Sequence, residues 1–120
     1  MSLSELFERY DDAWARHDLD AIVSLHAADG SFHLHAAGEP AIGREAVRAT
    51  FAAVLAQYPD LRFERREVRF GDDFVVFEYA MRVRGATIDA IDLFVVADGL
   101  VQRKETYLDA TVLAALQAAA

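Results

Sequence analysis

The sequence of 120 residues contains no cysteine, and this absence excludes several kinds of chemistry. A disulfide framework, a thiol nucleophile and a thiolate metal site all require cysteine. The four histidines have no spacing that defines a metal site, because His33 and His35 would need a carboxylate from far along the chain. The sequence also has no Gly-rich phosphate loop and no serine in a G-x-S-x-G turn. We therefore expect no metal and no cofactor.

Basic residues are scarce, with 12 Lys and Arg against 20 Asp and Glu, and the net charge is −8. Binding to a phosphate backbone or to an anionic membrane surface needs the opposite balance. No apolar run approaches 18 residues, so no transmembrane helix is expected. The first residues, MSLSELFERYDDAW, have no basic start and no continuous apolar stretch, unlike a signal peptide. We expect a soluble cytoplasmic protein without nucleic-acid or membrane partners.

Apolar residues make up 54% of the chain, which is enough for one hydrophobic core. The length fits one domain, over residues 1–120. Apolar positions recur at three- and four-residue steps in three segments, and this spacing predicts helices at 3–17, 19–27 and 44–58. Asp18 fits the N-cap of the second helix, and Pro59 ends the third.

Alternation of apolar and polar residues predicts strands at 31–35, 61–70, 74–83, 86–97 and 100–108. Turn residues join the last four strands, which should therefore be antiparallel. Residues 36–43 are expected to form a loop, and the tail 111–120 favours helix. The order α-α-β-α-β-β-β-β belongs to the α+β class. A curved antiparallel sheet wrapped over three helices would bury both apolar faces and leave an internal pocket.

Four separated segments resemble the nuclear transport factor 2-like superfamily, in particular its SnoaL-like and ketosteroid isomerase-like branch. They are YDDAWARHDLDAIVSLHAADGSF (10–32), IGREAVRATF (42–51), IDAIDLFVVADGLV (88–101) and ETYLD (105–109). The resemblance covers almost the whole chain. It implies a cone-shaped fold, in which a bent sheet packs on three helices around a pocket. It also implies a homodimer formed through the outer face of the sheet.

Asp92 lies in a run that otherwise reads as a buried strand. A buried ionised carboxylate is costly unless it is paired. Period two places it on the face of Ile88, Ala90, Phe94 and Val96. The resemblance implies that Asp92 is a protonated acid which, with Tyr10 on the first helix, donates hydrogen bonds to a developing oxyanion.

The resemblance also places Leu34 where the isomerases carry their carboxylate base, and a leucine cannot move a proton. His26, on the inner face of the second predicted helix, is a candidate to hold Tyr10 or to act as the base. The alternative is a core histidine that is satisfied by a backbone carbonyl. His33 and His35 alternate with Leu34 and should point away from the pocket.

Counting by two along the strand places Lys104 on the same face as Gln102, Thr106 and Leu108. If Lys104 faces inward, a pair with Asp92 would keep that carboxylate ionised. If Lys104 instead reaches the rim, Asp92 can remain a neutral donor. The sequence leaves both readings open.

The predicted catalytic residues are thus Tyr10, Asp92 and His26. The walls of a pocket in this fold are also walls of the core, and most of its expected ligand-binding residues are apolar or aromatic. These residues are Trp14, Phe32, Leu34, Phe51, Leu55, Phe77, Tyr79, Met81, Phe94, Lys104 and Leu108.

Three functions fit these observations. The first is an enzyme without cofactor, an isomerase or cyclase, that transfers protons on a small apolar carbonyl compound. The second is a binding module for an apolar or aromatic ligand. The third is a dimerisation or scaffold domain. The retained Tyr10 and Asp92 favour the first function, whereas Leu34 at the base position counts against it.

Overall fold

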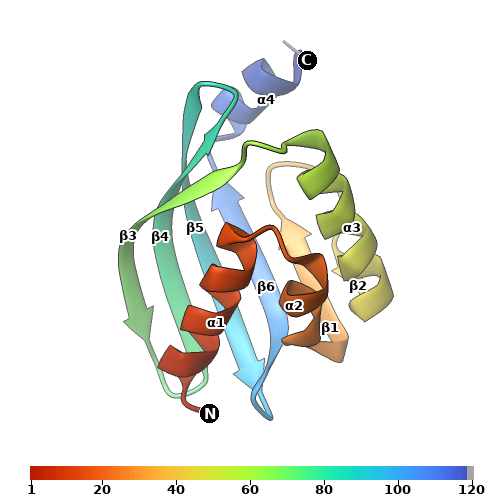
Figure 1. Cartoon of the computed structure of the whole chain (residues 1–120), viewed down its shortest axis with the longest axis vertical. Coiled ribbons are helices and arrows are strands. Elements are labelled where there is room, and N and C mark those ends of the chain that lie inside the picture. Colours follow the sequence, from red (N-terminus) through yellow and green to blue (C-terminus); the bar gives the residue numbers. More distant parts are fainter. Residues whose placement is uncertain (119–120) are drawn as a thin grey trace.

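A computed structural model describes residues 1–118, which form a six-stranded sheet and four helices (Figure 1). The α+β class is as expected. In chain order the elements are α1 (Leu3–Ala15), α2 (Leu19–Ser24), β1 (His26–Leu34), β2 (Ala41–Ile42), α3 (Arg44–Gln57), β3 (Arg62–Phe70), β4 (Phe74–Val83), β5 (Ala86–Ala97), β6 (Leu100–Leu108) and α4 (Ala110–Ala118).

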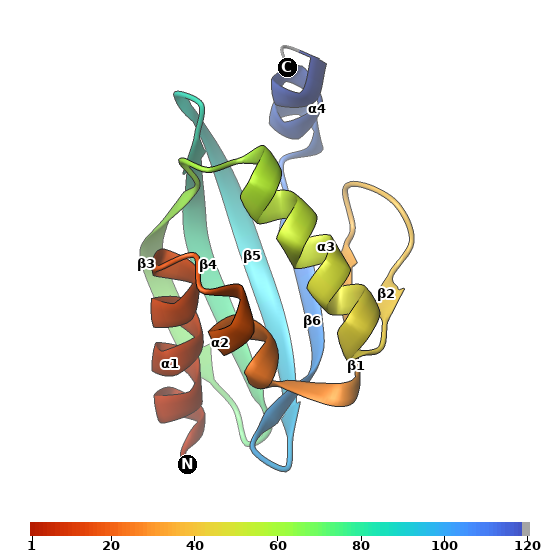
Figure 2. The ribbon, with the colours of Figure 1, turned by 45° about the vertical axis from the view of Figure 1, so that its right-hand side comes forward.

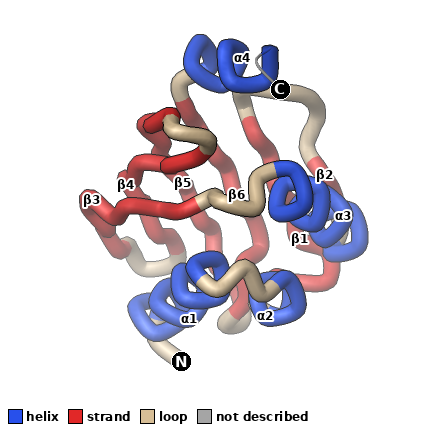
Figure 3. The backbone as a smooth tube through the Cα atoms, turned by 45° about the horizontal axis from the view of Figure 1, so that its top comes forward, coloured by secondary structure: helices blue, strands red, loops and turns tan. Residues whose placement is uncertain are grey.

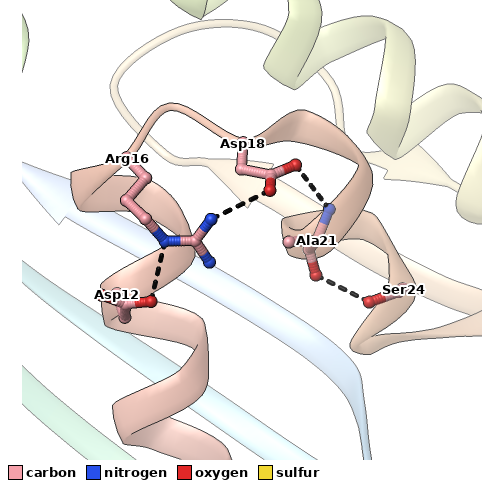
Figure 4. Close-up of polar contacts among 5 residues, drawn as sticks. All are labelled: Asp12, Arg16, Asp18, Ala21 and Ser24. Atoms are coloured by element: carbon pink, nitrogen blue, oxygen red, sulfur yellow. Dashed lines mark hydrogen bonds and ion pairs between the residues drawn. The ribbon is translucent and has the colours of Figure 1, made fainter.

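The junction between α1 and α2 is held by local polar contacts (Figure 4). The Asp18 carboxylate accepts a hydrogen bond from the Ala21 backbone N–H at 3.1 Å, so it caps α2. Arg16 bridges Asp12 at 2.9 Å and Asp18 at 3.0 Å. This arginine therefore joins the last turn of α1 to the cap of α2 at the surface.

The sheet has the strand order β2-β1-β6-β5-β4-β3. Strands β3 to β6 pair with their sequence neighbours in antiparallel fashion, as predicted. Strand β1, however, pairs with β6 in parallel. The curved sheet is therefore mixed: its last four strands are antiparallel, as expected, and its β1–β6 pair is parallel. Parallel pairing needs a long connection between the two strands, and α3 together with the four strands β2 to β5 supplies it here.

The two hairpins that join β4 to β5 and β5 to β6 turn at the residues expected from the sequence. Arg84 and Gly85 have φ of 50° and 77°, and Asp98 and Gly99 have φ of 55° and 74°. Two successive residues with positive φ make the type I′ geometry that suits the twist of antiparallel strands. These turns fix the register that places alternate residues of β5 on the helix side.

The early part of the chain differs from the prediction. The second helix ends at Ser24, and the first strand begins at His26 and not at residue 31. The register of β1 against β6 shifts between His26 and Ser31, and this irregularity hides the alternation that reveals a strand. Gly30 sits in this stretch, where an added Cβ would lie 3.0–3.1 Å from three carbonyl oxygens.

One further element, β2, was not predicted, whereas α4 corresponds to the tail for which helix was predicted. Two residues of the expected loop form β2, and a fourth helix, α4, follows β6. The predicted helical tail therefore forms from Ala110, while Ala119 and Ala120 lie outside the described residues.

Helices α1, α2 and α3 lie on the same face of the sheet, and the core fills the space between them and the strands (Figure 2). Helix α4 lies at the end of the molecule away from α1 and α2, and it contacts β5 (Figure 3). None of the described helices is both long and apolar enough to cross a membrane. The arrangement leaves room for a cavity between α3, α4 and the sheet.

Candidate functional site

A cavity of ≈ 220 Å³ lies between the helices and the inner face of the sheet. Alternate residues of β6 line it in the order Leu108, Thr106 and Lys104. The exposed side chains of Glu39, Gln57 and Gln117 belong to its lining and mark its rim. The cavity therefore runs from a polar rim beside α4 to a buried end at Lys104.

Eight of the predicted ligand-binding residues line this cavity. They are Trp14, Phe32, Leu34, Phe51, Tyr79, Met81, Lys104 and Leu108. The other three, Leu55, Phe77 and Phe94, are not in its lining. Phe77 and Phe94 instead line a gap of only ≈ 10 Å³ together with Tyr10 and Asp92. Trp14, Tyr79 and Lys104 line both spaces, so they separate the cavity from this gap.

Lys104 is 6% exposed and reaches the inner side of the sheet. Its register partners are Phe94 on β5 and Phe32 on β1, so an aromatic side chain stands on each side. The Nζ atom lies 4.8–5.6 Å from the centroids of five rings, those of Tyr10, Trp14, Phe32, Phe51 and Phe94. At these distances the ring faces attract a cation, and they do so more strongly without water. The ammonium therefore sits in an aromatic cage.

Asp92 supplies the counter-ion. Its Oδ2 lies 3.8 Å from Lys104 Nζ, and both side chains are almost fully buried. Its Oδ1 accepts hydrogen bonds from Tyr79 at 2.9 Å and from Thr106 at 2.6 Å. Thr106 is the register partner of Asp92 on β6, which explains the short contact. Both hydroxyl donors and the ammonium converge on this one carboxyl group.

Burial is the largest influence on both members of the pair, and it raises the pKa of Asp92 and lowers the pKa of Lys104. The two opposite charges act against burial, as do the hydroxyl groups that donate to Asp92. A carboxyl group that already accepts two hydrogen bonds and faces an ammonium is best described as a paired anion. At 3.8 Å between Lys104 Nζ and Asp92 Oδ2, the pair is held by charge attraction and not by a short hydrogen bond.

Tyr10 and His26 form a second buried pair. The Tyr10 hydroxyl lies 2.8 Å from His26 Nε2. Burial, helped by the charges of Lys104 and Arg44, lowers the pKa of His26 to about 3. Burial also raises the pKa of Tyr10 well above its ordinary value. A neutral histidine and a neutral tyrosine follow, and one hydrogen bond joins the Tyr10 hydroxyl to Nε2.

The placement of His26 differs from the expected one, because the residue begins β1 and does not lie on a helix. It is nevertheless fully buried. Neither His26 nor Tyr10 is part of the lining of the ≈ 220 Å³ cavity. Leu34 does line it, and His33 and His35 lie on the opposite face, as their alternation predicted.

Two other polar atoms bear on ligand binding. Trp14 Nε1 and the Tyr58 hydroxyl are buried, and neither has a hydrogen-bond partner within residues 1–118. Both residues line the cavity. A buried donor without a partner costs about 1–3 kcal/mol, which an acceptor on a bound ligand would recover. The sequence placed Tyr58 in the third predicted helix without assigning it to the site, and in the structure it is the residue that caps the end of α3.

The sequence analysis did not identify Thr106 as a support for Asp92. It also did not assign Leu113 and Leu116 of α4 to the wall of the cavity. The three-residue spacing of those leucines was the available signal.

On the outer face, His33, His35 and Glu105 form a group whose ligand atoms all lie within 4.8 Å of one another. His35 Nε2 is 3.6 Å from the carboxylate, and the His35 ring stacks on Tyr107 with centroids 4.2 Å apart. The parallel pairing of β1 with β6 brings the distant glutamate beside His33. These are the residues of the described chain that could hold a metal ion.

Residues 7–104 match the model of the SnoaL-like domain. No curated protein matches the chain. Among solved structures, an NTF2-like protein of unknown function from Burkholderia pseudomallei is 19% identical, with a TM-score of 0.85 over 97% of this chain and 98% of that one. TerC, co-crystallised with polyporic acid, is 22% identical, with a TM-score of 0.83 over 93% and 95%. IdmH, a candidate polyketide cyclase from Streptomyces antibioticus, is 19% identical, with a TM-score of 0.78 over 96% and 97%.

Proposed function

The chain belongs to the SnoaL-like domain family, and from that premise we propose that it is a cofactor-independent enzyme of the isomerase or cyclase type for a small apolar carbonyl compound. One observation carries the proposal. The apolar walls of the ≈ 220 Å³ cavity end on Lys104, which is paired with the buried Asp92 behind it. A hydrophobic core has no use for such a pair, because well-packed apolar residues are often at least as stabilising.

The chemistry is proton transfer next to a carbonyl group. Removing that proton places negative charge on the carbonyl oxygen, and a fixed positive group in a dry site stabilises the charge. Lys104 is the charged donor that the ligand oxygen meets first. Asp92 holds the ammonium in place, and the Tyr10 ring packs against it at 5.0 Å. In this proposal Tyr10 and Asp92 polarise the oxygen through Lys104.

The cyclase type also draws support from IdmH, which shares the fold and is itself a candidate polyketide cyclase. The polyporic acid bound in the TerC crystals is an acidic ligand on the same fold. An acidic oxygen is the ligand group that an ammonium at the cavity end would attract.

A binding module without catalysis is the second candidate. It is favoured because Glu39 is the one carboxylate among the described residues that line the cavity, and Glu39 lies exposed at the rim. Leu34 occupies the position of the isomerase base, and His26, whose pKa is about 3, lies outside the lining. A protein of this kind would hold the same ligand without changing it.

The experiment is binding of a series of phenols and naphthols of graded acidity, followed through the fluorescence of Trp14. This is the single tryptophan of the chain, and it lines the cavity. Affinity should rise with the acidity of the ligand, because the phenolate form pairs with Lys104. In Lys104→Met this dependence should disappear, at a cost of roughly 1–3 kcal/mol for the lost bond to charge.

Arg103→Met is the matched control, since it removes a neighbouring exposed cation from the same strand. Its affinities should equal those of the parent chain. Binding that follows only the apolar area of the ligands, with no effect of Lys104→Met, would refute the proposed site. A search for enolisation of bound ketones by deuterium exchange then separates the enzyme from the binding module.

We further propose that the protein is a cytoplasmic homodimer that associates through the outer face of the sheet. Ile91 on β5 and Tyr107 on β6 are register partners there, and they are 43% and 47% exposed. A second copy of the chain would cover these two large apolar side chains.

A further inference from the structure

Lys104 is the only lysine in the sequence. Of the 12 residues that are lysine or arginine, 11 are arginine. Many of the arginines lie at the surface and pair with carboxylates there, as Arg65 and Arg82 do. The chain thus uses guanidinium groups for its surface charge and keeps its single side-chain amine inside.

An amine differs chemically from a guanidinium in one relevant way. A guanidinium keeps its charge in proteins, whereas a buried ammonium gives up its proton readily and becomes a nucleophile. Burial lowers the pKa of Lys104. If a permanent cation were all that the site needed, arginine would supply it, as it does elsewhere in this chain.

The surroundings of Lys104 provide a route by which the ammonium can give up its proton to a neighbouring group. Five aromatic rings surround Nζ and keep water away, and the nearest carboxylate oxygen, Asp92 Oδ2, is 3.8 Å away and can take the proton. Two hydroxyl groups, from Tyr79 and Thr106, hold that carboxyl group through its other oxygen. The amine lines the cavity, so a ligand can reach it.

We infer that Lys104 is a nucleophile that forms an imine with an aldehyde or ketone bound in the cavity. The inference rests on the proposed function, because it assumes that carbonyl compounds bind there. In this inference the intermediate is an enamine and not an enolate. The reason is that a protonated imine draws electrons from the neighbouring carbon more strongly than a carbonyl group does. The same site can then labilise that carbon's proton without a strong base in its wall.

The step balances without an oxidant or a reductant. Asp92 takes a proton from the ammonium, and the free lone pair of Nζ adds to the carbonyl carbon. The electrons of the C=O π bond pass to oxygen, which takes the proton back. Nζ then loses its second proton, the hydroxyl group leaves as water with that proton, and the C=N bond forms. Addition of water reverses the sequence.

The test is reductive trapping of the full chain with 1-naphthaldehyde and cyanoborohydride, followed by peptide mass mapping. Only Lys104 and the N-terminal amine can be modified. Arg103→Lys is an internal control, since it adds an exposed amine on the same strand. The adduct on Lys104 should form measurably faster than the adduct at position 103, because a lowered pKa leaves a larger fraction of the buried amine neutral.

The outcomes separate this inference from the proposed function. Binding of 1-naphthol with trapping on Lys104 supports both, and Lys104→Met should then lose the internal adduct. Binding of 1-naphthol and of the aldehyde, with modification only at the N-terminus or at position 103, overturns the inference and leaves the proposed function standing. If neither compound quenches Trp14, both fail. Peptide mapping of the adduct on the parent chain tests the inference by itself, even if Lys104→Met does not fold.

Discussion

Replacing Asp92 by asparagine tests whether the buried pair is ionised. Asparagine has the same shape and can still accept the hydrogen bonds of Tyr79 and Thr106, so the main loss is the charge that faces Lys104. At the observed 3.8 Å and an effective dielectric constant of about 20, that attraction is about 4 kcal/mol. Removing one partner of a buried pair costs about 3–5 kcal/mol in general. At roughly 4 °C per kcal/mol, the thermal midpoint at pH 7 should fall by about 15 °C.

The pH dependence of this loss has a definite sign. Without Asp92, the pKa of Lys104 falls further below its ordinary 10.5, because the charge that opposed burial is gone. Between the folded and unfolded pKa values the unfolded chain binds more protons, so the stability of Asp92→Asn rises with pH until about pH 10.5. In acid the parent chain also loses its anion, since burial raises the pKa of Asp92. The difference between variant and parent should therefore be largest near neutral pH.

The assay is thermal unfolding by far-ultraviolet circular dichroism from pH 4 to pH 10. Asp89→Asn is the matched control, because Asp89 lies on the same strand with an exposed ion pair to Arg66. Its cost should stay below about 1 kcal/mol. If Asp92→Asn loses no more than this control, and the loss does not vary with pH, then Asp92 is a neutral acid and the ion-pair description is wrong.

Three other predictions follow from the buried pairs and the outer face. Tyr10→Phe leaves His26 Nε2 unpaired and should cost about 1–3 kcal/mol in urea unfolding; an unchanged midpoint would show that the 2.8 Å contact does not stabilise the fold. His26, with its pKa lowered to about 3, should stay neutral in NMR titrations until that pH. Stability should accordingly fall as pH drops from 6.5 towards 3, because the unfolded chain binds the extra proton. Ile91→Lys should convert a dimer into monomers in light scattering, whereas an unchanged mass would exclude this face as the interface.

Much of the fold could be predicted because its strongest signals are local. The last four strands alternate cleanly, and Arg84-Gly85 and Asp98-Gly99 occur where the chain must adopt positive φ. Because side chains alternate along a strand, counting by two then predicted which residues of β5 face the helices. These features need no knowledge of distant contacts.

The errors occurred where distant contacts decide the structure. His26 and Ala27 continue the apolar spacing of a helix, yet they enter the sheet because β6 offers hydrogen-bonding partners to β1. The parallel direction of that pair depends on the path of the whole chain, and no short segment encodes it. Strand β2 is only two residues long and has no periodicity to detect.

The site was predictable to a similar degree. Parity placed Asp92 and Lys104 on the same face of neighbouring strands, which allowed a pair to be considered. Parity alone could not distinguish a residue that lines the cavity from one that lies behind it, and so Phe77 and Phe94 were misplaced in the cavity lining. Which hydroxyl groups reach Asp92 depends on side-chain geometry.

Helix α4 has a consequence for how the protein could be altered. The buried end of the cavity lies at Lys104 of β6, which pairs with Asp92 of β5. Leu113 and Leu116 of α4 form part of the wall at the other end. Leu113 and Leu116 take no part in the Lys104–Asp92 pair or in the hydrogen bonds that hold Asp92. Substitutions in α4 should therefore change the length of molecule that is accepted and its rate of entry and exit. The group that acts on the molecule would stay the same, which makes ligand size and chemistry separately adjustable.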